Sequence, residues 1–368
     1  MLFRDGYRQS QVNNPMRNVL YIFNLSFDPE NEILSHSIDW ANEFTSHFSK
    51  VHIFTMQGNS IKNKSSNITV KLLKTKNSKS TIEVVLRTIS SLGTIYKNRK
   101  SSCVFFHMNH KPIPIVAPFL RLWGVPSGLW YSHKQSSLLL KVSEKLVNLV
   151  ASSTTESFPL HSKKLLVTGH AISPVFITQE FEVVEKSGIV HLGRVAPVKR
   201  IENIIFALAT LPREFRKLDL IGETPDLYYM EFLRGIGSEM DVSLNFLGSK
   251  GKADVAKRLC HYGICFSGTE KSVDKAPLEA ASLGCYIVSN NKGLMELSGM
   301  KVVMNKSLKV DSRNYSLQQL LESLLIENSF DHGKARRLIS DTVRVLNSLN
   351  FTIERISSAL LKGEPDFA

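Results

Sequence analysis

Hydrophobic and polar positions follow one another along the chain in short blocks that predict strands and helices in turn. Residues 18–27 form an apolar run typical of a buried strand, residues 37–48 have a helical pattern, and residues 50–56 are again strand-like. The theme recurs through the rest of the chain. Strands that alternate with helices favour parallel sheets covered by helices.

Two such alternating series are present, separated by the less patterned residues 171–186, which we interpret as a linker. The predicted strands of the two series are 102–108, 127–133 and 163–170, then 188–193, 217–223, 243–249, 262–268 and 285–291. The further predicted helices are 138–150, 200–212, 275–284, 317–325 and 351–362. The pattern therefore predicts an α/β protein with two Rossmann-like domains facing a cleft, where ligands bind at the carboxyl ends of strands.

The predicted boundaries divide the chain into four parts. Residues 1–17 form a polar tail, residues 18–172 the first Rossmann-like domain and residues 173–345 the second. Residues 346–368 form a C-terminal helix that we expect to pack back towards the first domain.

Length and composition agree with this division. A chain of 368 residues is too long for one ordinary core, and 43% hydrophobic with 21% charged residues is a globular composition. No run approaches the roughly 18 apolar residues of a membrane span, and the first residues lack the apolar centre of a signal peptide. The four cysteines show no paired metal-ligand spacing, so we predict a cytoplasmic protein with free thiols.

The net charge of +13 is the one extreme value, and much of it lies early. Residues 61–100 contain ten Lys or Arg and a single acid, Glu83. Such an excess suits a membrane surface, a nucleic acid or a phosphorylated substrate; the alternative is a solvated basic face. No nucleic-acid-binding signature accompanies the charge, so we do not expect a nucleic-acid partner.

The segment "GRVAPVKR" carries the first candidate chemistry. Gly193 ends a predicted strand, where a missing side chain lets the backbone approach a ligand. The planar guanidinium group of Arg194 can donate two hydrogen bonds to phosphate oxygens, and Lys199 adds a positive charge just before a helix N-terminus. The segment predicts a diphosphate clamp, and the alternative is a strand–helix turn with incidental surface cations.

A second candidate is Glu279, one turn inside a predicted helix that Gly284 ends. We expect the start of that helix to face the same cleft. A carboxylate is unsuited to a diphosphate but accepts hydrogen bonds from vicinal hydroxyls such as those of a ribose. The alternative is an exposed helix acid or a capping partner.

These segments together resemble glycosyltransferase family 4, retaining enzymes with the two-domain GT-B fold. The resemblance rests on "GRVAPVKRIENIIFAL" and "PLEAASLGCYIVS", and on "FFHMN", "LWGVPSGLWYSHK", "EKLVNLVASSTTESF" and "KKLLVTGHAI" in the first half. These stretches are similar to a bacterial subgroup with "LWYTHK"-like and "DKxxLEA"-like motifs, and they cover roughly residues 18 to 300 in order.

The resemblance implies a role for several residues. Arg194 and Lys199 match the pair that binds the donor's diphosphate, and Glu279 matches the second glutamate of the family's EX7E motif, which holds the nucleotide ribose. His133 matches a first-domain histidine near the transferred sugar. Without the resemblance, it would be interpreted as a histidine at the end of a strand that is hydrogen-bonded to the backbone.

The resemblance also implies roles for two loops. The loop of residues 28–36 would face the diphosphate or the acceptor, although Ser35 stands where the family has a glycine. Gly248 and Ser249 match the loop that binds the nucleotide base. The first domain would then take the acceptor and the second the nucleotide sugar.

One position departs from the family. Lys271 stands where the first glutamate of EX7E is expected, and Glu270 and Asp274 are the nearest acids. We expect Asp274 to cap the following helix through its carboxylate, which would leave Glu270 to contact a sugar hydroxyl.

The implied activity is transfer of a sugar, with retention, from a nucleotide-diphosphate sugar to a hydroxyl of a glycan or lipid-linked acceptor in cell-surface polysaccharide or lipopolysaccharide synthesis. We expect no cofactor and no metal, because no Asp-x-Asp motif lies in the cleft segments. The basic first domain would allow peripheral contact with the inner face of the membrane. The alternatives are another GT-B sugar-nucleotide enzyme, such as an epimerase, and a non-catalytic sugar-nucleotide-binding protein.

Overall fold

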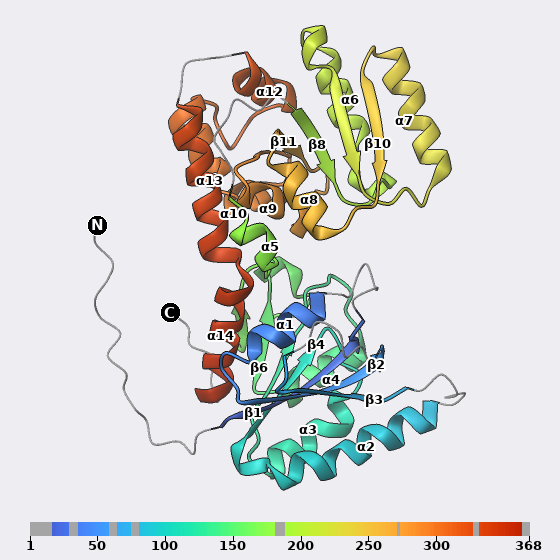
Figure 1. Ribbon diagram of the computed structural model, residues 1–368, viewed down its shortest axis with the longest axis vertical. Coiled ribbons are helices and arrows are strands. Elements are labelled where there is room, and N and C mark those ends of the chain that lie inside the picture. Colours follow the sequence, from blue (N-terminus) through green and yellow to red (C-terminus); the bar gives the residue numbers. More distant parts are fainter. Residues whose placement is uncertain are drawn as a thin grey trace.

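The computed structural model describes residues 17–28, 36–58, 65–74, 81–180, 188–270, 273–326 and 331–362. These residues form two lobes, one above the other in Figure 1, and two consecutive helices, α13 (His332–Asn347) and α14 (Leu349–Lys362), run along one side of both. Each lobe is built on one parallel sheet. The two Rossmann-like domains predicted from the sequence are therefore confirmed.

The N-terminal lobe contains a seven-stranded sheet in the order β3-β2-β1-β4-β5-β6-β7. Its strands are β1 (Val19–Ser26), β2 (Lys50–Gln57), β3 (Ile68–Leu72), β4 (Ser102–His107), β5 (Ser127–Trp130), β6 (Leu149–Ser152) and β7 (Leu165–Val167). All pairs are parallel, so the carboxyl ends of the strands meet at one edge, which faces the other lobe.

Helices cover both faces of this sheet. They are α1 (His36–Phe44), α2 (Thr81–Lys97), α3 (Ile113–Leu122) and α4 (Leu138–Leu146). Along β1, Leu20 and Ile22 pack into a core shared with α1 and α14, whereas Tyr21 and Phe23 pack into a core shared with α2, α3 and α4. Because successive strand side chains point to opposite faces, one apolar strand supplies both cores.

The C-terminal lobe contains a five-stranded parallel sheet in the order β10-β9-β8-β11-β12. Its strands are β8 (Gly188–Leu192), β9 (Lys217–Ile221), β10 (Ser243–Gly248), β11 (Tyr262–Phe266) and β12 (Tyr286–Val288). Its helices, besides α13, are α5 (Pro174–Thr178), α6 (Glu202–Ala209), α7 (Leu227–Glu239), α8 (Lys252–Leu259), α9 (Lys275–Ser282), α10 (Lys292–Leu297), α11 (Met300–Val303) and α12 (Leu317–Leu325). A single buried core joins this sheet to its helices.

The chain passes between the lobes at two adjacent places. The backbone of Ile172 exchanges hydrogen bonds with Asn347 and Leu349, at the break between α13 and α14. Gly169 lies against this break with φ +75°, and a Cβ there would approach the Leu346 carbonyl oxygen to 2.3 Å. Helix α14 then packs on α1 and β6 of the N-terminal lobe.

Two predicted elements are wrong in part. Residues 138–150 are predicted to be one helix, but α4 ends at Leu146 and strand β6 begins at Leu149, because Leu149 and Ala151 are buried in the core of the sheet. The expected linker at 171–186 includes helix α5, whose Phe176 is buried; residues 181–187 lie outside the described residues.

Candidate active site

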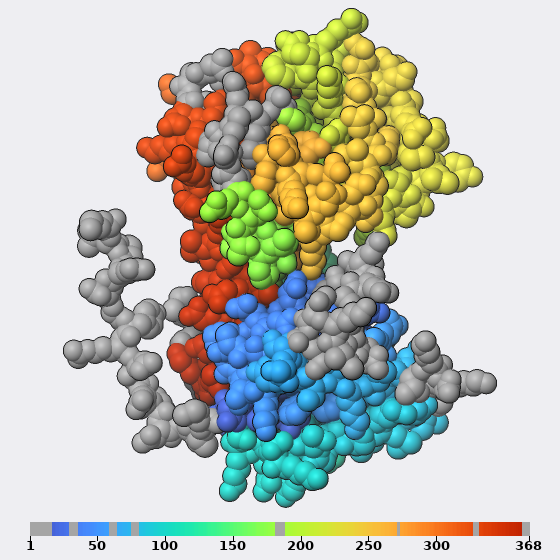
Figure 2. Space-filling view, viewed as in Figure 1, coloured from blue at the N-terminus to red at the C-terminus, as the bar shows by residue number. Residues whose placement is uncertain are grey.

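A cavity of about 340 Å³ lies between the two lobes, at the carboxyl ends of β8 and β9. The predicted residues Gly193, Arg194, Ser249 and Glu279 all line it, and His36 at the start of α1 closes it from the N-terminal lobe. In Figure 2, α8 and α5 of the upper lobe meet the lower lobe at the waist of the molecule. The site is therefore built from loops that the parallel topology brings to one edge.

Glycine backbone forms one wall of the cavity. Gly193 has φ +129° and Gly222 has φ +152°, conformations that side chains disfavour. A Cβ on Gly222 would lie 2.0 Å from the carbonyl oxygen of Gly193. The two loops are also tied together, because the amide of Gly193 donates to the Ile221 carbonyl and that of Val195 to the Glu223 carbonyl.

The charged residues of the lining are mostly cations. Arg194, Lys250, Lys252 and Lys275 line the cavity, against the two acids Glu223 and Glu279. A site with this excess of positive charge, next to accessible backbone, suits an anionic group such as a diphosphate.

The acid Glu279 has a neighbour one turn earlier on α9. Its Oε1 lies 3.8 Å from Nζ of Lys275. Burial raises the pKa of Glu279 and lowers that of Lys275, and each partner's charge opposes the effect of burial on the other. The side chain of Glu279 lines the cavity beside this ammonium group.

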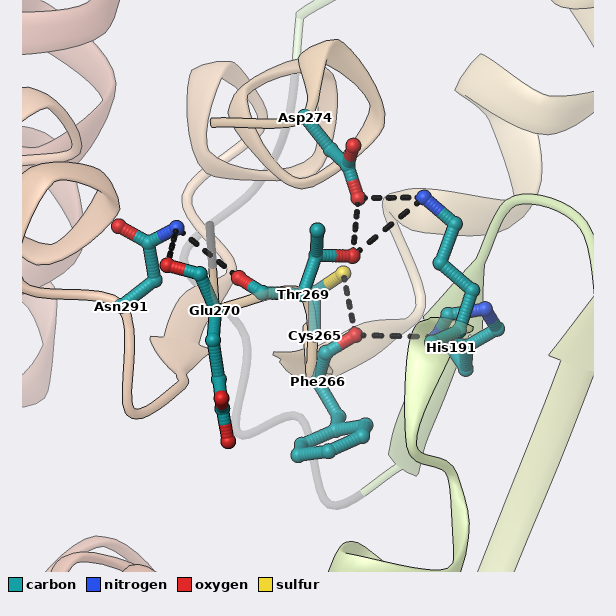
Figure 3. A network of polar contacts seen from close by, with 8 residues as sticks. His191, Cys265, Phe266, Thr269, Glu270, Asp274 and Asn291 are labelled. Carbon is teal, nitrogen blue, oxygen red and sulfur yellow. Dashed lines mark hydrogen bonds and ion pairs between the residues drawn. The ribbon is translucent and has the colours of Figure 1, made fainter. Parts of the chain in front are cut away.

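Lys199 does not line the cavity but takes part in a network beside it, shown in part in Figure 3. Its Nζ lies 2.6 Å from Oδ2 of Asp274, and the Thr269 hydroxyl donates to the same oxygen at 2.7 Å. The Asn291 side-chain amide fixes the loop by donating to the carbonyls of Thr269 and Glu270. The ammonium of Lys199 therefore forms an ion pair with the carboxylate of Asp274 in this structure.

This network corrects one expectation. Asp274 does occupy the residue before α9, but its side chain makes no capping hydrogen bond. The carboxylate instead accepts from the ammonium of Lys199 and the hydroxyl of Thr269, because packing of this loop against the loop after β8 brings a cation within 2.6 Å of it. Glu270 lies on the surface with its Oε1 3.5 Å from Nη1 of Arg200, away from the cavity wall.

The remaining predicted residues are more scattered. His133 lies in the loop after β5, exposed, and its Nδ1 accepts from the amide of Gln135. Gly248 ends β10 with φ +68°, and its carbonyl accepts from the amide of Gly222. Ser35 and Lys271 lie outside the described residues. Neither His133 nor Gly248 lines the cavity.

Sequence reasoning missed the contact between the lobes. Asp39 of α1 accepts from Nζ of Lys252 at 3.0 Å and from the Ser173 hydroxyl at 3.0 Å. His107 and His170, buried near this junction, have pKa values lowered by burial and further by the charge of Lys275. Only tertiary packing brings these residues together, so the sequence carried no signal for them.

Several solved structures are similar to this one over most of the chain. The chain aligns with a glycosyltransferase from Rickettsia africae at 13% identity and a TM-score of 0.69, covering 94% of this chain and 99% of that chain. It aligns with the lipopolysaccharide outer core galactosyltransferase WaaB at 13% identity and a TM-score of 0.62, covering 92% and 99%. No family model and no curated protein matches the sequence.

The chain has the GT-B fold. A third similar structure is Anabaena HepE in complex with UDP, at 14% identity and a TM-score of 0.57, covering 88% of this chain and 99% of that chain. At these identities the likeness concerns the fold, and a role for the GT-B cleft of this chain must be argued from its own residues.

Proposed function

We propose that this chain is a retaining glycosyltransferase that moves a sugar from a nucleoside-diphosphate sugar to a hydroxyl of a glycan or lipid-linked acceptor. The observation that carries the proposal is the cleft cavity, where Gly193, Arg194 and Glu279 meet beside an excess of cations. The similar HepE structures contain UDP and UDP-glucose, and WaaB is a lipopolysaccharide galactosyltransferase, which supports a nucleotide-sugar donor and a role in cell-surface polysaccharide or lipopolysaccharide synthesis.

The proposed reaction breaks the bond between the sugar C1 and a β-phosphate oxygen. The acceptor oxygen forms the new bond to C1 on the same face, and its proton passes to the departing phosphate. Negative charge grows on the diphosphate as it leaves, and Arg194 with its neighbouring lysines would stabilise that charge where it forms. Glu279 would hold the ribose hydroxyls, and Ser249 with Gly248 would face the base.

Lys199 needs a change of partner to act in this scheme. Its ammonium is held by Asp274 beside the cavity. A bound diphosphate would compete for it, because three N–H donors on a flexible stem can serve a second anion. His133 and Glu270 stay proposed contacts of the transferred sugar, although neither lines the cavity in this structure. The protein's own cations supply the charge, so the proposal needs no metal ion.

We also propose that the basic N-terminal lobe makes peripheral contact with the inner face of an anionic membrane. No helix among the described residues is long and apolar enough to cross a bilayer. Lysine and arginine near an anionic surface contribute about 1 kcal/mol each. Binding to anionic vesicles should weaken as salt rises, and equal binding to neutral vesicles contradicts the proposal.

Proton NMR of the products tests the proposed activity against its alternatives. A panel of nucleoside-diphosphate sugars is incubated with the chain, with and without lipid-linked and free glycans. The proposal predicts a glycoside with the donor's anomeric configuration, formed only when acceptor is present. An altered sugar nucleotide without acceptor indicates an epimerase, and tight binding without any product indicates a non-catalytic protein.

A further inference from the structure

Lys252 is a cation of the cleft cavity that is held by a residue of the other lobe. It is the first residue of α8, and Val255, one turn further along this helix, also lines the cavity. Its Nζ lies 3.0 Å from Oδ2 of Asp39, which belongs to α1 of the N-terminal lobe. Figure 1 shows α1 and α8 on the facing sides of the two lobes. An ion pair therefore joins the lobes at the wall of the cavity.

The carboxylate of Asp39 has a second partner that fixes its orientation. The Ser173 hydroxyl donates to the same Oδ2 at 3.0 Å. Ser173 directly follows Ile172, whose backbone is hydrogen-bonded at the break between α13 and α14. Asp39 thus contacts the connection between the lobes and a cation of the C-terminal lobe at the same time.

Helix α1 itself is held firmly against the N-terminal sheet. Its Trp40 is buried in the core, and the Ser37 hydroxyl donates to the carbonyl of Ser26 at 2.6 Å. Asp39 lies three residues after His36, so the two side chains share one face of the helix. Because His36 lines the cleft cavity, this face of α1 is the one that meets the C-terminal lobe.

The arrangement around Lys252 indicates what Asp39 does. Lys252 lines the cavity, whereas Asp39 is not among the lining residues, so the carboxylate supports the ammonium from outside the cavity. An ammonium group has three N–H donors, and those that Asp39 does not use can serve an anion in the cavity. Lys199 shows the opposite case, because Asp274 holds its ammonium beside the cavity. Of these two lysines, Lys252 is the one already in place to meet a ligand.

The ion pair is better suited to positioning a side chain than to stabilising the fold. The side chains of Lys252 and Asp39 are 39% and 31% exposed, and water screens ion pairs that are exposed to this extent. A lysine side chain loses many rotamers when it binds a ligand. Holding it in one position beforehand lowers that cost and so raises the affinity for the ligand.

We propose that Lys252 contacts the donor diphosphate and that Asp39, from the N-terminal lobe, is the positioning residue that holds it at the cavity. This inference rests on the proposed function and adds the N-terminal lobe to the parts of the chain that determine affinity for the diphosphate. Asp39 acts only through Lys252, since its own negative charge repels the ligand.

Two substitutions of Asp39 separate its hydrogen bond from its charge. Asp39→Asn and Asp39→Ala both remove the charge, but only asparagine keeps an oxygen that can accept from Lys252. The full chain is titrated with inorganic diphosphate, a probe that requires neither base nor sugar. Asp39→Ala should bind it about fivefold more weakly than Asp39→Asn, because the lysine must then be ordered on binding. In the Lys252→Met background this difference should disappear.

The role of Lys252 is tested by exchanging the two charges. Lys252→Met should weaken diphosphate binding about 10- to 100-fold, because a hydrogen bond between charged groups is lost. The double variant Asp39→Lys/Lys252→Asp restores an ion pair between the lobes but places a carboxylate at the cavity, so its affinity should not recover. The control is Asp254→Ala, since this acid of α8 is paired with Arg258 at 3.0 Å and does not line the cavity. Its affinity should stay within about twofold of the natural chain in 0.15 M salt, which screens distant charges.

The outcomes separate this inference from the proposed function. Equal affinities of Asp39→Ala and Asp39→Asn overturn the inference, and so does a difference that persists without Lys252, since Asp39 would then act through Ser173. Recovered affinity in the exchanged variant also overturns it, because the pair would then only tie the lobes together. In these three cases the natural chain still binds diphosphate and the proposed function stands. A natural chain that binds neither inorganic diphosphate nor any nucleoside diphosphate refutes the proposed function, and the inference with it.

Discussion

Replacing Lys199 by methionine separates two roles that the structure assigns to this side chain. Lys199 is 14% exposed and its partner Asp274 is 24% exposed, so the pair is largely but not fully shielded from water. Methionine keeps the length and apolar stem of lysine and removes the charge. Asp274 then retains only the hydrogen bond from Thr269.

The size of the stability effect follows from this shielding. Breaking a fully buried pair costs about 3–5 kcal/mol, whereas exposed pairs contribute about 0–1 kcal/mol. We therefore expect Lys199→Met to lower the free energy of unfolding by about 2 kcal/mol. Asp274→Asn should cost about 1 kcal/mol, because the amide oxygen still accepts from Thr269. The double variant should show a coupling of about 1 kcal/mol between the two positions.

The catalytic effect should differ from the stability effect. Loss of one contact to the leaving diphosphate costs about 2.7–4 kcal/mol, so Lys199→Met should lower kcat/KM about 100- to 1000-fold. Asp274→Asn frees the ammonium and should bind nucleoside diphosphate at least as tightly as the natural chain. Urea denaturation, titration with nucleoside diphosphate and initial rates measure these quantities. If Lys199→Met loses stability but keeps its kcat/KM, Lys199 serves only the loop and the reasoning is wrong.

Three further predictions use the same cleft. Gly222→Ala should destabilise the chain by about 2–4 kcal/mol, because its Cβ would meet the Gly193 carbonyl, whereas Gly235→Ala in open space on α7 should stabilise it by about 0.5–1 kcal/mol in the same denaturation assay. Glu279→Gln should weaken nucleoside diphosphate binding about tenfold while sparing inorganic diphosphate, which has no ribose; equal loss for both ligands contradicts the assignment. The pKa of His170 is about 4, against 6.5 in the unfolded chain, so protons bind the unfolded chain preferentially. His170 should therefore contribute about 2 kcal/mol to the fall in the free energy of unfolding from pH 7 to pH 5. A His170→Asn variant whose stability has the same pH slope refutes this contribution.

The fold was predictable where its strands are buried apolar runs, as in β1 and β4. Residues such as Leu20 and Tyr21 serve opposite faces of one sheet, so the sequence shows an unbroken hydrophobic block. Helix α2 escaped prediction for a different reason. Its buried residues include the polar Thr88 and Ser91, whereas the apolar Ile82, Leu86 and Ile89 are exposed, so its sequence does not follow the pattern of an amphipathic helix with an apolar buried face.

The candidate site was predictable where it depends on strand ends. Gly193 follows β8, and Arg194 and Glu279 reach the same edge because parallel strands present their carboxyl ends together. The partner of Lys199 was not predictable, since Asp274 approaches it only through the packing of the loop after β11. The contact between Asp39 and Lys252 depends on how the two lobes sit together.

Release of nucleoside diphosphate by the chain and by Arg194→Met tests the central claim most directly. Arg194 lines the cleft cavity and is exposed, so its replacement should leave the fold intact. With a panel of nucleoside-diphosphate sugars and a lipid-linked acceptor, the account predicts acceptor-dependent release for at least one donor and a loss of about 100-fold or more in the variant. Release at the same rate by both chains, or from no donor in the panel, would contradict it.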